Sequence, residues 1–368
     1  MMFADATLNV NLDALAANYR ALQTYADKSE CAAVVKANAY GLGIKPIAQA
    51  LWDAGARRFF VATVDEGMEV RDLLPGALVY IFHGFRKGQE KDLSECRLIP
   101  VLNSREQIAL WQAHAQTVGR MPAVLHFDTG MNRLGLNVSE VEKLAENQLA
   151  LDGLDIQCVM SHFACASQPE HDLNEEQYNR FNRLRRMFPE TNASMANSAA
   201  ALLKTCYHFD LIRPGIALYG SNPLGENAPV KMKPVVTLKA NVLQVRTVER
   251  AGGVGYGATH EARQGEKLAT LGLGYADGYL RCLGNVAKGY LNGTETPVVG
   301  RVSMDLIIVD VSAVPEAVLK VGAEVELLGE RCTIDTLAKQ ANTIPYEILT
   351  RLGHRLKRVY TKEQAAAA

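Results

Sequence analysis

A lysine at the end of an apolar run is the residue whose position most clearly suggests chemistry. Lys36 closes the run at residues 31–35, and Tyr40 follows it four positions later, just before Gly41. A strand-end lysine is usually a surface group whose alkyl chain covers apolar neighbours. Inside the mouth of a barrel, loss of water would lower its pKa and suit the amine to Schiff-base formation or proton transfer. Lys36 is therefore a candidate catalytic amine, provided that the surrounding elements form such a mouth.

Two later segments contain residue types that bind phosphate. Asn197 and Ser198 follow one apolar run, and Gly215 and Ile216 follow the next. In eight-stranded barrel enzymes, backbone N–H groups after the seventh and eighth strands commonly bind a phosphate group. A helix cap beside a turn glycine is the alternative, and the same residues fit it. Arg213 lies among apolar residues in the second segment, and a buried arginine normally has a partner.

The elements that must position these residues alternate between apolar runs and amphipathic segments. Between residues 30 and 220, the segments that separate the runs have apolar residues three and four positions apart, as in helices. The eight runs, each a predicted strand, cover residues 31–36, 57–63, 77–84, 97–103, 123–128, 155–163, 192–196 and 209–215. This alternation predicts an α/β fold with a parallel sheet, either a closed (β/α)8 TIM-type barrel or an open doubly wound sheet.

The polar residues favour the closed barrel. Lys36, Asp128, His162, Asn197 and Arg213 all lie at or just past the carboxyl ends of predicted strands. Barrels place their active sites at this end, with residues converging from several strands. An open sheet would bind a ligand there as well, but it would not need so many strands to contribute.

The pattern changes near Pro234. Beyond it, strand-like runs separated by glycine-rich turns predict a mostly β domain, interrupted by a short helix at about residues 333–341. We therefore divide the chain into a barrel at residues 8–232 and a β-rich C-terminal domain at residues 233–368. The first run, at about residues 5–11, precedes the barrel and is expected to pair with the second domain.

Composition limits the class of partner. The formal net charge is -1 and no long run of Lys or Arg occurs, so neither nucleic acid nor an anionic membrane is an expected partner. No apolar stretch of about 18 residues and no leader-like start is present, which predicts a cytoplasmic protein. The 7 cysteines are scattered without a CxxC pair, so we expect reduced thiols and no metal site. A small molecule is the expected ligand.

Six short motifs occur in order along both domains. They are VVKANAYGLG, DTGMNRLG, RPGIALYG, GYGA, GYADG and GRVSMD, beginning at Val34, Asp128, Arg213, Gly255, Gly274 and Gly300. Together they resemble the alanine racemase family, and the resemblance extends from about residue 5 to residue 360. It implies an isomerase that uses pyridoxal 5'-phosphate (PLP) to interconvert L-alanine and D-alanine, supplying D-alanine for peptidoglycan.

The resemblance also implies a head-to-tail homodimer in which each site is completed by the partner. Lys36 would be the Schiff-base lysine and the proton-transfer base on one face of Cα. Tyr256, in GYGA, would serve the opposite face from the other subunit. Racemisation needs two such groups, because one removes the proton while the other supplies it from the far side.

By the same resemblance, further residues would bind cofactor and substrate. Arg133 would orient the substrate carboxylate or the cofactor phenolate oxygen. Arg213 would face the ring nitrogen and keep it unprotonated, which weakens the ring as an electron sink and favours returning the proton to Cα. His162 would flank the ring and hydrogen-bond Arg213. The phosphate would be held by Tyr40, Asn197, Ser198, Gly215 and Ile216, and the substrate entrance would be lined by Tyr275 and Met304, both from the partner subunit.

Two positions depart from the family pattern. Many members carry a lysine, modified to a carbamate, where this chain has His126. A bound anion such as chloride, or the imidazole itself, would then balance Arg133. A tyrosine that some members use on the phosphate corresponds to His354, which is therefore a candidate phosphate ligand.

Three alternatives remain open on sequence alone. A serine or broad-specificity racemase of the same fold would differ in pocket volume, and a pocket rejects an extra methylene or hydroxyl only weakly. A decarboxylase of the same barrel class would leave the motifs around Tyr256 and Met304 without a purpose. The non-enzyme alternative is a PLP-binding protein without turnover, and the presence of both Lys36 and Tyr256 argues against it.

Overall fold

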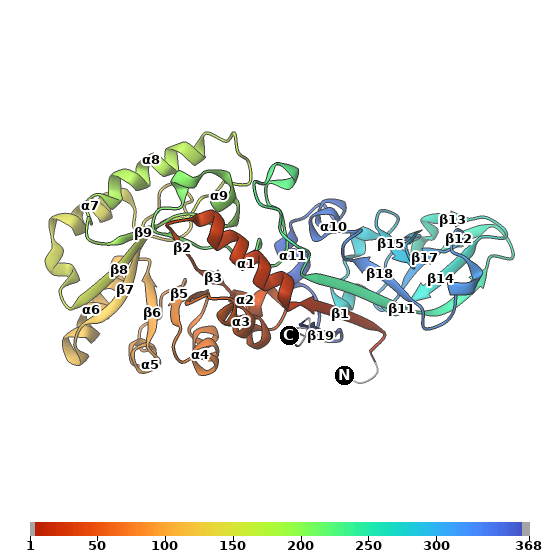
Figure 1. Ribbon diagram of the computed structural model, residues 1–368, viewed down its shortest axis with the longest axis horizontal. Coiled ribbons are helices and arrows are strands. Elements are labelled where there is room, and N and C mark those ends of the chain that lie inside the picture. The colour runs from red at the N-terminus through yellow and green to blue at the C-terminus, as the bar shows by residue number, and fades with distance from the viewer. Residues whose placement is uncertain (1–3, 363–368) are drawn as a thin grey trace, which may run out of the picture.

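The computed structural model describes residues 4–362, so the last six residues assigned to the second domain, with their alanine run, lie outside the described residues. Two bodies follow one another along the long axis of the molecule (Figure 1). The first is an α/β barrel and the second is a mostly β domain. The fold class predicted from the sequence is therefore confirmed.

The barrel strands follow one another in chain order. Strands β3 to β9 form a seven-stranded parallel sheet, and β10 pairs in parallel with β2. The strands are β2 (Glu30–Cys31), β3 (Ala33–Val34), β4 (Arg58–Val61), β5 (Leu78–Ile81), β6 (Leu98–Leu102), β7 (Met121–His126), β8 (Leu154–Met160), β9 (Asn192–Ser194) and β10 (Leu211–Ile212). Since β2 and β3 are two halves of one strand, these elements occupy eight positions, each overlapping one of the eight predicted runs.

Backbone hydrogen bonds close this sheet into a barrel. Asp210 N–H donates to Ala193 O at 3.0 Å, and Arg213 N–H donates to Ala196 O at 2.9 Å, so that β10 joins β9. On its other edge β10 pairs with β2. The ring is complete, and the open doubly wound sheet is excluded.

Helices cover the outside of the barrel, as the helical spacing of apolar residues predicts. They are α1 (Leu12–Ala26), α3 (Ile44–Asp53), α4 (Val64–Leu73), α5 (Glu90–Glu95), α6 (Arg105–Val118), α7 (Val138–Glu146), α8 (Leu173–Arg185) and α9 (Ser198–Leu203). Two of them begin with a capping box, formed by Thr63 and Glu66 on α4 and by Asn137 and Glu140 on α7. Local sequence thus determines where these helices start, and with that the length of the loops before them.

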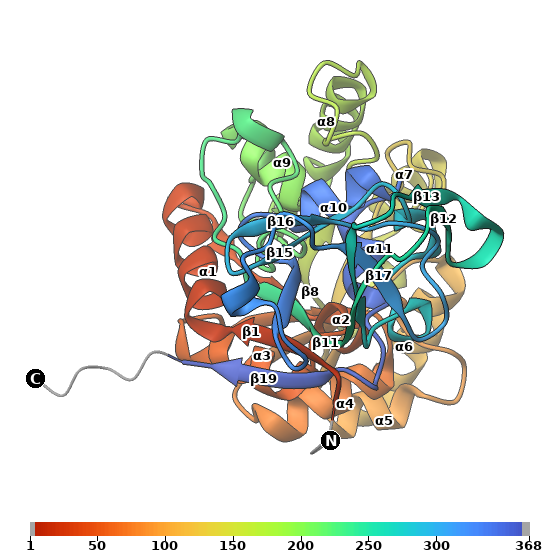
Figure 2. The ribbon, with the colours of Figure 1, turned by 90° about the vertical axis from the view of Figure 1, so that its right-hand side faces the viewer.

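The second domain is built on a sheet that contains both the first and the last described strands. β1 (Ala6–Asn11) pairs antiparallel with β11 (Val236–Thr247) and parallel with β19 (Lys357–Thr361), and Figure 2 shows the three together. The remaining strands and helices are β12 (Gly252–Val254), β13 (His260–Ala262), β14 (Lys267–Leu271), β15 (Lys288–Leu291), β16 (Thr294–Pro297), β17 (Ile307–Asp310), β18 (Glu324–Leu328), α10 (Ile334–Gln340) and α11 (Pro345–Thr350). Short 3₁₀ turns occur in both domains. Those of the first domain are η1 (Gln148–Leu151), η2 (Thr205–Tyr207) and η3 (Gly225–Asn227). Those of the second domain are η4 (Tyr256–Ala258), η5 (Tyr275–Asp277), η6 (Arg281–Leu283) and η7 (Glu316–Val318).

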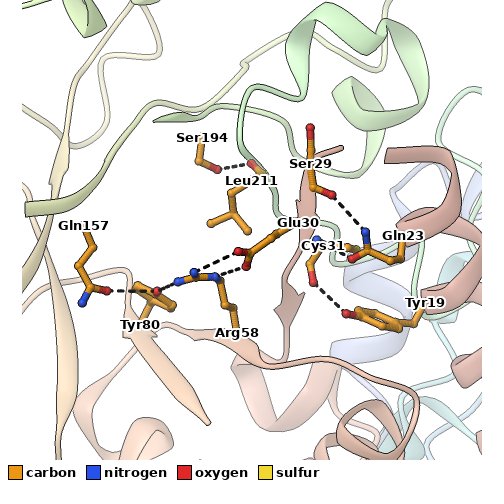
Figure 3. A network of polar contacts seen from close by, with 10 residues as sticks. All are labelled: Tyr19, Gln23, Ser29, Glu30, Cys31, Arg58, Tyr80, Gln157, Ser194 and Leu211. Atoms are coloured by element: carbon orange, nitrogen blue, oxygen red, sulfur yellow. Dashed lines mark hydrogen bonds and ion pairs between the residues drawn. The ribbon is translucent and has the colours of Figure 1, made fainter. Parts of the chain in front are cut away.

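A polar network lies at the amino ends of β2 and β4 (Figure 3). Arg58, at the start of β4, donates to the Glu30 carboxylate and to the Tyr80 hydroxyl. Tyr80 in turn donates to Gln157 Oε1 at 3.5 Å. Tyr80 is fully buried, so its hydroxyl depends on this network for hydrogen bonds. Residues at this face of a barrel serve stability, while the opposite face holds the chemistry.

Arg58→Met is expected to lower the free energy of unfolding by about 1–3 kcal/mol, because it removes the donor to the buried Tyr80 hydroxyl. Urea unfolding followed by circular dichroism measures the change. Arg120→Met is the matched control, since Arg120 forms an exposed ion pair with Asp155 that is worth at most about 1 kcal/mol. Equal losses in the two variants would contradict the proposed contribution of the network.

Candidate active site

Lys36 stands at the carboxyl end of the barrel, where β3 passes into α2, a single turn at Lys36–Tyr40. The turn is left-handed, with φ of 55° at Ala37, 52° at Asn38, 51° at Ala39 and 57° at Tyr40. For L-residues this conformation costs about 1–2 kcal/mol each relative to the right-handed helix. Such strain persists only where surrounding contacts impose it, and it clusters at functional sites.

Contacts at both ends hold this turn. On the barrel side, Ala37 N–H donates to Glu66 Oε1 at 2.6 Å. At the other end, the Arg358 guanidinium of β19 donates to the Gly41 carbonyl, at 3.2 Å from Nε and 3.0 Å from Nη2. Between them, Gly41 N–H donates to Ala37 O at 2.8 Å. The β domain therefore contributes directly to the backbone conformation that follows the lysine.

The half-buried Lys36 side chain lies among groups that change its charge state. Burial lowers the pKa of Lys36, the nearby Arg133 guanidinium lowers it further, and the Glu66 carboxylate raises it. The ammonium lies 5.6 Å from the centre of the Phe82 ring, within range of a cation–π contact. A lysine with a lowered pKa is suited to nucleophilic and proton-transfer work.

Arg213 brings a second cation into the interior. Its side chain, 2% exposed, donates to Ser194 Oγ, to Ser161 O at 2.6 Å and, at 3.5 Å, to His162 Nδ1. Burial lowers the pKa of Arg213 to about 10. Its Nε–H is also buried and has no hydrogen-bond partner among the described residues. An unpartnered buried donor is rare and calls for an acceptor supplied by a ligand.

The residues predicted to hold phosphate are gathered at one corner of the mouth, between Tyr40 and the loops after β9 and β10. Asn197 caps α9 by accepting from a backbone N–H of its first turn at 3.0 Å, and Ser198 Oγ accepts from Gly215 N–H at 2.9 Å. The Tyr40 hydroxyl approaches Gly215 so closely that a Cβ there would lie 2.1 Å from it. Ile216 follows and is fully buried. Glycine is thus required at residue 215 for the phenol to reach this corner.

His162 lies between Arg213 and the phosphate corner. Its Nδ1 is 3.5 Å from Arg213 Nη2, and its Nε2 is 3.5 Å from Asn197 Nδ2. Both distances are at the limit for a hydrogen bond, so the expected contact with Arg213 is present but long. Burial and then the Arg213 charge lower the pKa of His162 well below its ordinary value. The imidazole is therefore neutral at physiological pH.

His126 ends β7 and meets Asn103, which follows β6, with Nδ1 and Oδ1 2.7 Å apart. The direction of this bond can be assigned. Asn103 Nδ2 lies 2.9 Å from each of two backbone carbonyls, and carbonyls only accept, so its Oδ1 faces the histidine and His126 Nδ1 donates. Burial, then Arg213 and Arg133, lower the pKa of His126 to about 4. The ring is neutral with Nε2 as an acceptor, so this position holds no anion of its own.

Arg133 lies on the loop between β7 and α7, which Asp128 shapes. Asp128 Oδ1 accepts from three successive backbone N–H groups at 2.9, 2.9 and 3.2 Å. The Arg133 guanidinium is exposed, and it is close enough to lower the pKa of Lys36, His126 and His162. The loop therefore presents a cation to whatever occupies the mouth.

The three residues expected from a partner subunit are exposed on the β domain. Tyr256 is 72% exposed, Tyr275 41% and Met304 54%. Tyr256 follows β12, and Figure 1 places β12 and β13 at the end of the β domain remote from the barrel. Within one chain Tyr256 therefore does not meet Lys36. The other two loops are joined, since Ala276 N–H donates to Met304 O at 3.0 Å.

Tyr346, which the sequence alone does not single out, lies beside Tyr40 with ring centres 5.9 Å apart. It belongs to α11, which contacts α2. His354 is exposed instead, and its neighbour Arg355 binds Asp277 at 2.7 Å. Tyr346 is thus a further candidate from this part of the chain. A tyrosine in the first turn of a short helix carries no sequence signal of its own, because only tertiary packing brings it to the mouth.

These features define a class of protein. It is a two-domain protein with an α/β barrel, and the mouth of the barrel combines a strained lysine turn, several cations and a corner suited to an anion. No group of three or more His, Cys, Asp or Glu side chains in residues 4–362 could hold a metal ion. No helix in that range is long and apolar enough to cross a membrane.

The chain belongs to the alanine racemase family. The model of the alanine racemase N-terminal domain matches residues 10–223, and the model of the C-terminal domain matches residues 235–360. Alanine racemase of Rhodospirillum rubrum is 48% identical over 361 residues, covering 97% of this chain and 96% of that protein. A catabolic alanine racemase of Agrobacterium fabrum is 45% identical, covering 97% of this chain and 92% of that protein.

A solved structure agrees with the fold. The crystal structure of alanine racemase from Bartonella henselae, which contains covalently bound pyridoxal phosphate, superposes with a TM-score of 0.92. Its sequence is 40% identical, and the match covers 98% of this chain and 100% of that chain. The family expected from the six motifs is therefore confirmed.

His126 is expected to remain an Nδ1–H tautomer and to take up a proton only near pH 4, because burial and two guanidinium groups disfavour its cation. Since its folded pKa lies below the ordinary value of about 6.5, the unfolded chain binds the proton first. The free energy of unfolding should therefore fall between about pH 6.5 and pH 4. Nitrogen-15 spectra of the imidazoles report tautomer and titration directly. A His126 resonance titrating near pH 6.5, or protonated on Nε2 alone, would contradict the assignment.

Proposed function

We propose that the chain interconverts L-alanine and D-alanine with PLP bound at the mouth of the barrel. Membership of the alanine racemase family supports this activity, and the cofactor of the Bartonella henselae relative supports PLP. The observation that carries the proposal is the unpartnered Nε–H of Arg213. It calls for a buried acceptor in the same mouth as the Lys36 amine.

The residues present fit this cofactor. An unprotonated ring nitrogen would supply the acceptor that Arg213 Nε–H lacks among the described residues. The corner formed by Tyr40, Ser198 and Gly215 brings two hydroxyl groups and backbone together for the phosphate, with Asn197 and Ile216 beside it. A phosphate and a substrate carboxylate would also offset the positive charge of the mouth. When bound, PLP supplies an electron sink that acidifies the α-proton of an amino acid.

Lys36 is proposed to hold the cofactor covalently and to move the α-proton on one face of Cα. Its lowered pKa supports this role, because a base must be partly deprotonated at the working pH. Arg133 is proposed to orient the substrate carboxylate or the cofactor phenolate oxygen by a charge-assisted hydrogen bond. The neutral His126 supports that role, since its Nε2 can accept a hydrogen bond from a nearby guanidinium.

Tyr256 is proposed to act on the opposite face, from a second copy of the chain. Its exposure and its distance from its own barrel support a head-to-tail homodimer. Tyr275 and Met304, also exposed, would line the substrate entrance of the partner's site. One chain alone would present the lysine without its counterpart.

The reaction is proposed to supply D-alanine for peptidoglycan in the cytoplasm. All seven cysteines are unpaired, which supports a reducing compartment. The relative from Rhodospirillum rubrum is named alanine racemase, and the relative from Agrobacterium fabrum is named catabolic alanine racemase. A strain lacking the gene that requires added D-alanine would support the biosynthetic role, and one that fails only to grow on alanine would support the catabolic role.

Incubation of the purified protein with L-alanine in D2O tests the activity. We expect deuterium at Cα, read by proton NMR, and D-alanine, read by chiral chromatography, with both lost in Lys36→Ala. A parallel incubation with L-serine distinguishes a broad-specificity racemase. Absence of exchange and of D-alanine from wild-type protein carrying PLP would overturn the proposal and leave a PLP-binding protein without turnover.

Mixing two inactive variants tests the shared site. Lys36→Ala and Tyr256→Phe homodimers should each have low activity. After exchange of subunits, a mixed dimer contains one site with both intact residues, so activity should rise well above that of either variant. If Lys36 and Tyr256 act within one chain, mixing restores nothing, and the head-to-tail assignment fails.

A further inference from the structure

We infer that Glu66 is a positioning residue for Lys36: its carboxylate ties the left-handed turn after the lysine to the neighbouring strand end and places a negative charge near the amine. The inference rests on the proposed function, since the position of Lys36 matters most if Lys36 is the reacting amine. Glu66 is not part of any of the six family motifs. Within residues 4–362 its carboxylate hydrogen-bonds none of the residues of the phosphate corner.

The two oxygens of Glu66 bind different segments. Oε1 accepts from Ala37 N–H at 2.6 Å, at the residue directly after the lysine. Oε2 accepts from Ala62 N–H at 2.8 Å and, more weakly, from Thr63 N–H at 3.4 Å, just past the end of β4. One side chain thus connects the carboxyl ends of β3 and β4, which are adjacent strands of the barrel. Hydrogen bonds to an ionised carboxylate are stronger than those between neutral groups.

A comparison within the molecule separates this function from helix capping. Glu140 forms the same capping box on α7 and accepts from Asn137 N–H at 3.0 Å through one oxygen. In Glu66 one oxygen likewise meets the cap residue, and the second reaches across to Ala37. Capping explains the contact with Thr63 and leaves the contact with Ala37 unexplained.

The strain of the turn gives that contact its importance. Four successive L-residues after Lys36 have positive φ, and Tyr40 is the last of them. If the turn relaxed, Lys36 would move relative to Tyr40, and therefore relative to the phosphate corner where the Tyr40 hydroxyl lies. Ala37 is the first strained residue, so a bond to its N–H holds the turn where it begins.

Charge provides a second link between Glu66 and the lysine. The charged groups that act on the Lys36 amine are Glu66 from α4 and Arg133 from the loop after β7. His162, from the loop after β8, is neutral, and its own pKa is lowered in part by the charge of Lys36. Glu66 raises the pKa of Lys36, while burial and Arg133 lower it. Removing the carboxylate charge should therefore lower the pKa of Lys36 further.

Hydrogen exchange in the full-length chain tests the tether. In Glu66→Gln, amides of residues 37–43 should exchange about tenfold faster, because the amide side chain cannot accept from both segments. Glu140→Gln removes the matching cap on α7, and Thr63→Ala removes the hydroxyl half of the same capping box. Both controls should leave exchange in residues 37–43 unchanged. Equal acceleration in Thr63→Ala and Glu66→Gln would show that Glu66 only caps α4 and would overturn the inference.

The pH dependence of cofactor attachment tests the charge. In cofactor-free full-length chain, attachment of PLP to Lys36, followed by absorbance, needs the unprotonated amine, so its midpoint reports the pKa of Lys36. The midpoint should move to lower pH in Glu66→Gln and stay in place in Glu140→Gln. Glu66→Asp keeps the charge on a shorter side chain. Its attachment midpoint should stay near that of the wild type, while the amides of residues 37–43 should exchange as fast as in Glu66→Gln. An unchanged midpoint in Glu66→Gln would contradict the inference that the Glu66 charge acts on Lys36.

These readouts are independent of racemisation. If the wild type fails to exchange the α-proton of alanine, the proposed function fails, while the tether is still judged by hydrogen exchange. If the wild type racemises and Glu66→Gln matches Glu140→Gln in exchange, midpoint and kcat, only the inference fails. Melting temperatures of the two glutamine variants, expected to be similar, exclude general loss of folding as the cause.

Discussion

The guanidinium of Arg213 is held inside the barrel, and no carboxylate of residues 4–362 pairs with it. It is 2% exposed, its bonds go to a hydroxyl, two backbone carbonyls and an imidazole, and its Nε–H has no partner among the described residues. Removing a cation from water is costly unless other groups compensate. Burial, and then the same charge, lower the pKa of His162 and of His126, so that both imidazoles stay neutral. The mouth is thus preorganised for an anionic ligand that accepts hydrogen bonds.

The lysine turn depends on contacts from separate parts of the molecule. Its backbone would not be left-handed on its own, since the alanines at residues 37 and 39 disfavour this conformation. Asn38 tolerates it better, and its side-chain oxygen accepts from Ile44 N–H at 2.8 Å. Glu66 of the barrel holds one end and Arg358 of the β domain holds the other. Each domain therefore supplies a side chain that binds the backbone of the turn after Lys36.

Elements with a repeating pattern of apolar residues, and the polar residues at the ends of those elements, can be predicted from the sequence alone. The eight barrel strands follow from apolar runs, and Lys36, His162, Asn197 and Arg213 meet because parallel strands end on the same side. The left-handed turn could not be predicted, because Ala37 and Ala39 are ordinary helix formers and the strain is imposed by tertiary contacts. Tyr346 and Glu66 reach the site only through tertiary packing, which leaves no pattern in the local sequence. Tyr256 carries no local signal, so its role followed from the family motif alone.

The bond between Arg358 and Gly41 joins residues 317 positions apart in the chain. At about 5–20 residues per second, a ribosome needs on the order of 15–60 s to make that intervening stretch. The barrel strands are complete long before β19 appears, so a nascent barrel can form while the backbone next to its lysine still lacks one of its two supports. A chain interrupted before β19 would contain every residue of the barrel mouth and still present the lysine on an unsupported turn. In this order of synthesis, the turn after Lys36 gains its second support only when β19 has joined the second domain.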